Sequence, residues 1–274
     1  DTGDQAQAER AKRILLHCGD RIAESREYHV TWPEETTSKM LGAMWDVLEE
    51  APVFTDAERL RCLNTLLATL CSLPRQVSGY RALDSNDTLI WNHTTFPLIG
   101  IYWLARYFDR YYGDTKGHTK PMLSKVRAAF EGQVVSWKPQ EDSLGYYSIV
   151  PLHTIEYTLA ENDYRYFENG SVRQHADYTI AICDNTGDAA GFGDSGYGRA
   201  PYTNNIHWAL WYYRDGRYLW WLNKVLPKGY ASPYSPDVEE KTWPEIQGVK
   251  AVRLHPEVYR FTQNHASYSE PIAP

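Results

Sequence analysis

The segment Trp91–Gly113 reads WNHTTFPLIGIYWLARYFDRYYG and is the most informative part of this sequence. Its large apolar residues recur at helical spacing, at Ile99, Tyr102, Trp103 and Tyr107. Gly113 is a residue type that commonly ends a helix. The segment therefore predicts an aromatic helix that follows a polar dipeptide.

The entry into this helix carries several polar residues. Thr94 and Thr95 can each act as the N-cap, and Pro97 is tolerated in a first helical turn. On this interpretation Asn92 and His93 stand immediately before the helix. Helix amides would point towards them, which favours an anionic group at that place.

The Asn92–His93 pair suits acid–base chemistry on an anionic substrate. Asn92 can donate hydrogen bonds to a carboxylate, and His93 can transfer a proton near neutral pH. A plainer interpretation remains open, in which Asn92 caps a turn and His93 is a surface or packed histidine.

The composition is that of a folded globular protein with room for a substantial core. The 274 residues are 43% hydrophobic and 23% charged, so one large domain or two small ones would fit. Aromatic residues reach 14%, which suits either a cleft lined for sugar rings or an aromatic core. A net charge of −7 argues against general nucleic-acid affinity, so an anionic substrate would need a local cluster of cations.

Helical periodicity dominates the chain, whereas strand-like alternation is almost absent. We predict helices over 5–24, after Pro33, from Thr55 to Pro74, from Thr94 to Gly113, and over 120–136, 151–167, 171–183, 203–213 and 217–226. The pattern predicts an all-α fold. Without a fixed repeat length, a closed ring of helical hairpins is favoured over a regular solenoid.

Several shorter motifs carry less information. The four cysteines have neither metal-ligand spacing nor a CxxC pair. The glycine-rich loop 184–199 contains both GDSG and GxGxxG patterns, but a helical chain offers neither a protease barrel nor a βαβ unit. His153 and Glu156 share a helix face, and a polar pair is the simpler interpretation than two ligands of a metal. We expect no metal and no redox cofactor.

The polar loop WKPQEDSLGYY ends in Tyr146 and Tyr147. Tyr147 lies 54 residues beyond His93 in the sequence. In an array of helical hairpins this separation spans two or three helices, so both loops can open at one end of a ring. A tyrosine at a cleft edge can serve as an acid, or as a base when nearby cations lower its pKa. Simple packing of both rings is the alternative.

WNHTTF before an aromatic helix, followed by DSLGYYSIVPLHTIEY, resembles the heparinase II/III-like and related alginate lyases. The likeness extends loosely over residues 5–226, although Ile149 and Val150 replace the usual Glu-Gly of the family motif. The resemblance implies an incomplete (α/α) toroid over residues 1–230. Residues 231–274 would then be an extended linker, with a possible strand in GVKAVRL, towards a C-terminal β-domain of a longer chain.

The resemblance also implies β-elimination on a uronic-acid polysaccharide, leaving a 4,5-unsaturated uronate. Asn92 would bind the C6 carboxylate, His93 or a tyrosinate would take the C5 proton, and Tyr147, with Tyr146 as the alternative, would protonate O4. Further substrate contacts are expected from Trp91, His153, Arg199, Tyr202 and His207. The expected location is secreted or periplasmic, although this chain carries no signal peptide, and neither nucleic acid nor a membrane is expected as a partner.

Two other classes of function fit the sequence. A glycoside hydrolase on a similar ring would use paired carboxylates, either Glu141 with Asp142 or Asp188 with Asp194. A non-catalytic glycan-binding or scaffolding domain would bind sugars without turning them over.

Overall fold

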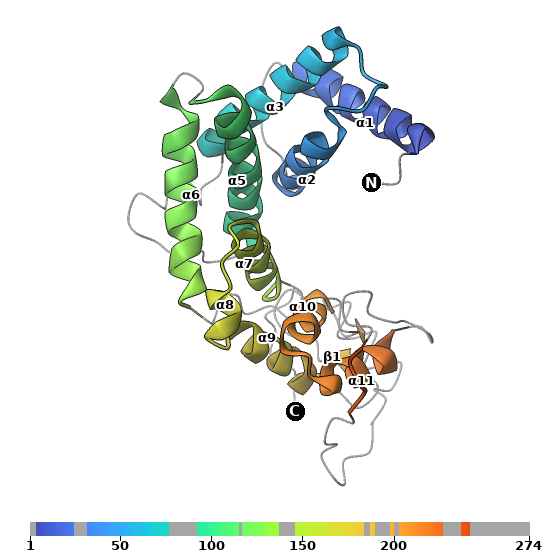
Figure 1. Ribbon diagram of the computed structural model, residues 1–274. Helices are drawn as coiled ribbons and strands as arrows, with labels where there is room; N and C mark the ends of the chain where they lie inside the picture. The colour runs from blue at the N-terminus through green and yellow to red at the C-terminus, as the bar shows by residue number, and fades with distance from the viewer. Residues whose placement is uncertain are drawn as a thin grey trace, which may run out of the picture. The chain divides into compact units, whose positions relative to one another are not determined.

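The computed structural model in Figure 1 describes residues 4–24, 32–76, 92–114, 117–136, 146–183, 187–189, 198–199, 203–226 and 237–241. Helices account for 78% of these residues, which confirms the all-α prediction. The strands in the described ranges are two antiparallel pieces of two residues each, β1 (Asp188–Ala189) and β2 (Gly198–Arg199). The closed ring stays a prediction, and both the boundary at residue 230 and the GVKAVRL segment lie outside the described residues.

The chain forms two compact units. Unit 1 comprises residues 1–89 and 93–132, and unit 2 comprises residues 90–92 and 133–274. The helices of unit 1 are α1 (Gln5–Glu24), α2 (Trp32–Leu48), α3 (Asp56–Gln76), α5 (Asn92–Tyr112) without its first residue, and most of α6 (Thr119–Val134). Helices α1 and α2 both pack against α3.

Helix α3 begins as the sequence predicts and ends later. Glu58 Oε2 accepts from the Thr55 backbone N–H at 2.8 Å, and the Glu58 N–H donates to Thr55 Oγ1 at 3.3 Å, so the capping box is confirmed. The predicted end at Pro74 is wrong, because the helix continues to Gln76. Leu73, which is fully buried, holds this last turn in the core, and Pro74 removes only the one hydrogen bond that its own N–H would have made.

Helix α5 also differs from the prediction at its start. It begins at Asn92, so Asn92 and His93 occupy its first turn and do not precede it. Thr94 and Thr95 are buried inside that turn and do not stand at the cap position. The helix ends at Tyr112, and Gly113 follows with φ of +70°, which confirms the predicted stop.

A buried hydrogen-bond chain joins α2 to α5. Trp45 Nε1 donates to the Tyr107 hydroxyl at 2.9 Å, and this hydroxyl donates to Glu49 Oε2 at 2.5 Å. Burial and the Glu49 carboxylate both raise the pKa of Tyr107. The two helices approach closely at Gly42, where a Cβ atom would lie 3.2 Å from Leu104 Cδ2.

The helices of unit 2 are α7 (Ile149–Ala160), α8 (Arg165–Glu168), α9 (Ser171–Ala181), α10 (Asn204–Tyr213) and α11 (Gly216–Val225). Helix α10 packs against α7, α9 and α11 around a buried core that includes Phe167, Leu210, Tyr218 and Leu222. The helix predicted over 151–167 is divided in two at Asn162, which has φ of +55°. Asp163 then accepts a hydrogen bond from the first N–H of α8, that of Arg165, at 2.9 Å.

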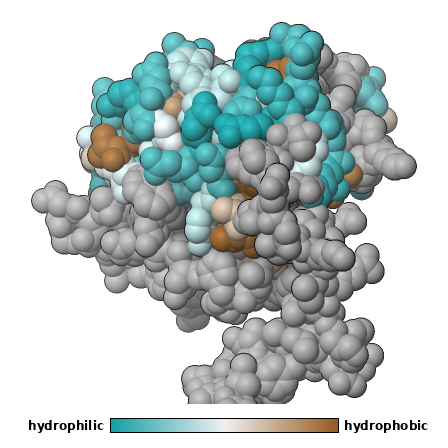
Figure 2. Space-filling view, turned by 90° about the horizontal axis from the view of Figure 1, so that it is seen from below, coloured by the Kyte–Doolittle hydropathy of each residue, from teal (hydrophilic) through white to brown (hydrophobic). Residues whose placement is uncertain are grey.

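The described surface is mostly polar. On the face shown in Figure 2, hydrophilic side chains cover most of the described surface, and hydrophobic ones form small separate patches. No helix in the described ranges is both long enough and apolar enough to cross a membrane.

Replacing Tyr107 by Phe should destabilise unit 1 by about 1–3 kcal/mol. The substitution leaves the Trp45 N–H and the Glu49 carboxylate without their shared hydroxyl. Urea unfolding of the wild type and the variant measures the loss. Tyr111→Phe is the matched control, because its ring is half-exposed and its hydroxyl makes no hydrogen bond to another described residue. An equal loss in both variants would contradict the role of the hydrogen-bond chain.

Candidate functional site

The turn Tyr146–Ser148 immediately precedes α7 and is held by Tyr147. The Tyr147 hydroxyl donates to Thr179 Oγ1 and lies 3.2 Å from the His175 carbonyl oxygen. Thr179 Oγ1 donates to the same carbonyl at 2.8 Å. These bonds fasten the turn to α9, and the edge of the Tyr178 ring packs on Tyr147 with centroids 5.1 Å apart.

Tyr147 is therefore packed against α9, which favours the packing alternative for its ring, and its catalytic role stays a prediction. Its side chain is only 6% exposed, and burial raises the pKa of the phenol instead of neighbouring cations lowering it. A tyrosinate base at this position is thus disfavoured. Tyr146, its neighbour in the turn, is half-buried and is the more accessible of the two phenols.

Unit 2 contains buried polar atoms without a described partner, one of them in this turn. Ser148 Oγ is buried, and no hydrogen-bond partner for it lies within the described part of the chain. The same holds for both amide atoms of Asn205, on α10, a helix that packs against α7 and α9. Buried polar atoms without a protein partner commonly bind water or a ligand. Sequence reasoning did not single out Ser148, His175, Thr179 or Asn205, although Asn205 lies in the NNIHW motif beside His207.

Asn92 is buried, with 5% of its surface exposed, whereas His93 is half-buried. The boundary between the two units falls between these residues, so Asn92 belongs to the same unit as Tyr146 and Tyr147, and His93 belongs to the other. The first N–H groups of a helix have no partner within the helix, so the first turn of α5 can supply donors to an anion.

The structure describes three of the remaining predicted site residues in whole or in part. His153 is 1% exposed within α7, so a direct contact with substrate is not supported and its packing role is favoured. His207 is half-buried on α10, and burial lowers its pKa. Arg199 contributes its backbone to β2, opposite Asp188. The side chain of Arg199 lies outside the described part, as do Trp91, Glu141, Asp142, Asp194 and Tyr202.

Neither a disulfide nor a cluster suited to a metal is found in the part of the chain that the structure describes. None of the four cysteines forms a disulfide, and burial raises the pKa of the Cys62 thiol to about 11. No three His, Cys, Asp or Glu side chains gather among the described residues in the manner of a metal site.

Comparisons with protein-family models, with curated proteins and with solved structures each found no match.

Replacing Tyr147 by Phe should lower the free energy of unfolding by about 1 kcal/mol, because a buried hydroxyl with two partners is lost. Tyr178 is a half-exposed residue of α9, and Tyr178→Phe should change the free energy of unfolding by less than about 0.5 kcal/mol. Urea unfolding compares the two. Unchanged stability of the Tyr147 variant would argue against its anchoring role.

The stability of the protein should fall as the pH falls below about 6.5, with a contribution from His207. Burial lowers its folded-state pKa, so the unfolded chain binds more protons in the range between the unfolded and folded pKa values. The contribution of the neutral His207 to the free energy of unfolding is therefore fully present above the pKa of the unfolded chain and is lost on acidification. The free energy of unfolding should vary less with pH in His207→Gln than in the wild type between pH 7 and pH 5, a range of about two units that includes the ordinary pKa of histidine. Identical curves for the variant and the wild type would contradict this effect.

Proposed function

We propose that this protein is a lyase that cleaves uronic-acid-containing polysaccharides by β-elimination. In this reaction the C5 proton of a uronate is removed, the C4–O4 bond breaks, and a 4,5-unsaturated sugar is formed. The C5 proton becomes sufficiently acidic only when hydrogen bonds neutralise the neighbouring C6 carboxylate and stabilise the enolate-like intermediate. We also propose that the helices belong to an incomplete (α/α) toroid followed by a β-domain.

The observation that supports the proposal is the buried amide of Asn92 at the first position of α5. The half-buried phenol of Tyr146, in the turn before α7, supplies the second group. Unit 2 contributes the buried polar atoms of Ser148 and Asn205. An amide that donates to a carboxylate and a phenol that donates a proton are groups that such an elimination requires.

The burial of Tyr147 changes the roles that the sequence suggested. We assign proton donation to O4 to Tyr146, because it is the more accessible phenol, and an anchoring role to Tyr147. Asn92 binds the C6 carboxylate together with the first-turn amides of α5. His93, the next residue along the chain, is the candidate base for the C5 proton.

The experiment is a screen of alginate, glucuronan, heparan sulfate and ulvan for products that carry the conjugated double bond, followed by ultraviolet absorbance. On the polymer that is cleaved, Asn92→Asp should lower kcat/KM by at least about a hundredfold, because a carboxylate repels the substrate carboxylate where an amide would bind it. The substitution is nearly isosteric, and an acidic residue in the first turn is compatible with the helix dipole.

Asn64→Asp on α3 is the control with the same change of charge, and it should leave kcat/KM within about twofold of the wild type, because it alters only an exposed side chain. The thermal unfolding midpoint should be similar in all three proteins. Absence of unsaturated product from every polymer, or full activity of the Asn92 variant, would overturn the proposal.

A further inference from the structure

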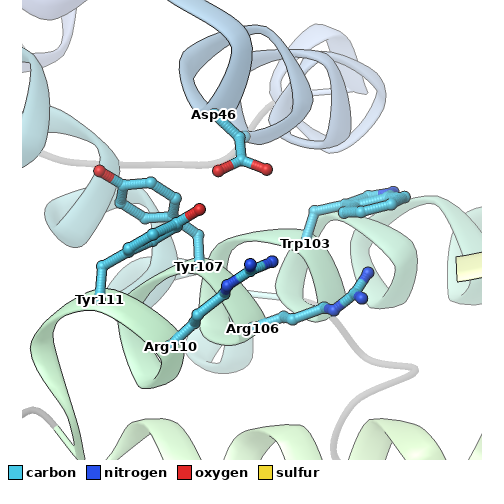
Figure 3. Close-up of a pocket in the computed structure, with 7 residues that line it drawn as sticks. Asp46, Trp103, Arg106, Tyr107, Arg110 and Tyr111 are labelled. Carbon is cyan, nitrogen blue, oxygen red and sulfur yellow. The ribbon is translucent and has the colours of Figure 1, made fainter. Parts of the chain in front are cut away.

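Unit 1 contains a second feature with the properties of a ligand site, an open pocket of about 160 Å³ between α2 and α5 (Figure 3). Its labelled lining residues are Asp46, Trp103, Arg106, Tyr107, Arg110 and Tyr111. We call it the arginine pocket. A space of this volume holds many water molecules and admits a sugar ring.

Two guanidinium groups one helical turn apart give the arginine pocket its charge. The Arg106 guanidinium lies 5.6 Å from the centroid of the Trp103 ring, and that of Arg110 lies 5.3 Å from the Tyr111 ring. Stacking covers the face of a guanidinium, whereas its N–H donors point outward in the plane. Within the described ranges, the contacts found for the two guanidinium groups are those with aromatic rings.

The third charged group is the Asp46 carboxylate, which faces the arginines from α2. Two cations and one anion give the arginine pocket a local charge of +1 in a chain of net charge −7. A simple anion would be attracted by the arginines and repelled by Asp46. A sugar with one acidic group can pair with all three charged side chains. Its carboxylate accepts hydrogen bonds from the two arginines, and its hydroxyls donate hydrogen bonds to Asp46.

Aromatic rings complete this arrangement. Trp103, Tyr107 and Tyr111 line the arginine pocket, and such rings commonly pack against the apolar face of a sugar. The Tyr107 ring is fixed by its hydrogen bonds to Trp45 and Glu49, so this part of the wall is held before any ligand binds.

We propose that the arginine pocket binds one acidic sugar residue of a glycan chain. The choice of a uronate as that residue rests on the function proposed above. Arg106 and Arg110 follow Asn92 by 14 and 18 positions on α5, about 21 and 27 Å along the helix axis. The arginine pocket is therefore remote from Asn92 along α5.

The test is isothermal titration calorimetry in an Asn92→Asp background, which keeps the ligand intact. The ligands are uronate oligosaccharides prepared from alginate and from glucuronan, a cellulose oligosaccharide of equal length, and inorganic sulfate. Arg106→Gln combined with Arg110→Gln should weaken binding of at least one uronate oligosaccharide by about tenfold or more, because charge-assisted hydrogen bonds are lost. The control, Arg10→Gln combined with Arg13→Gln on the exposed face of α1, makes the same change in net charge and should weaken binding less than about twofold.

Equal weakening by both double variants would overturn the proposal, because it would show a general effect of charge. Binding of the neutral oligosaccharide as tightly as the uronate, or of sulfate as tightly as the sugar, would overturn it as well. If the arginine pocket binds uronates but no polymer is cleaved, the proposed reaction fails while this site stands. If a polymer is cleaved and neither its KM nor oligosaccharide binding changes in the Arg106 and Arg110 variant, the site fails while the reaction stands.

Discussion

The hydrogen bonds of the buried Tyr147 hydroxyl are the constraint on which the account of unit 2 depends. They join the turn before α7 to Thr179 and to the His175 carbonyl on α9, and burial raises the pKa of the phenol. A phenol held in this way is suited to positioning its neighbours. The consequence is a fixed place for Tyr146 and for the buried hydroxyl of Ser148, the two side chains that flank Tyr147.

Unit 1 also contains a buried tyrosine with a hydrogen-bonded hydroxyl. This residue, Tyr107, joins α2 to α5 and lines the arginine pocket. The hydrogen bonds from Trp45 and to Glu49 use the hydroxyl and leave part of the ring as a wall of the pocket. A binding site whose walls are already fixed loses less conformational entropy when a ligand binds. In both units, therefore, a buried tyrosine hydroxyl holds the groups that the proposals assign to sugar binding.

Local signals in the sequence predicted most helices, because periodicity and capping depend on residues that are neighbours in the chain. The capping box at Thr55 and the stop at Gly113 are examples. Features that depend on contacts between residues distant in the chain were not predicted. Pro74 does not end α3, since Leu73 is buried in the core, and Tyr147 is sealed by contacts with α9 that its own loop sequence does not reveal. The arginine pocket was missed for the same reason, because Asp46 and Arg106 meet only after α2 has packed on α5.

The central claim is that cleavage occurs by elimination, and the masses of the products test it most directly. Mass spectrometry of the oligosaccharides released from a uronate polymer by the purified protein gives the number of water molecules added at each cleavage. The account predicts that none is added, so the unsaturated fragment is lighter by one water than its hydrolytic counterpart. Products that each contain an added water would contradict the account and would indicate a glycoside hydrolase.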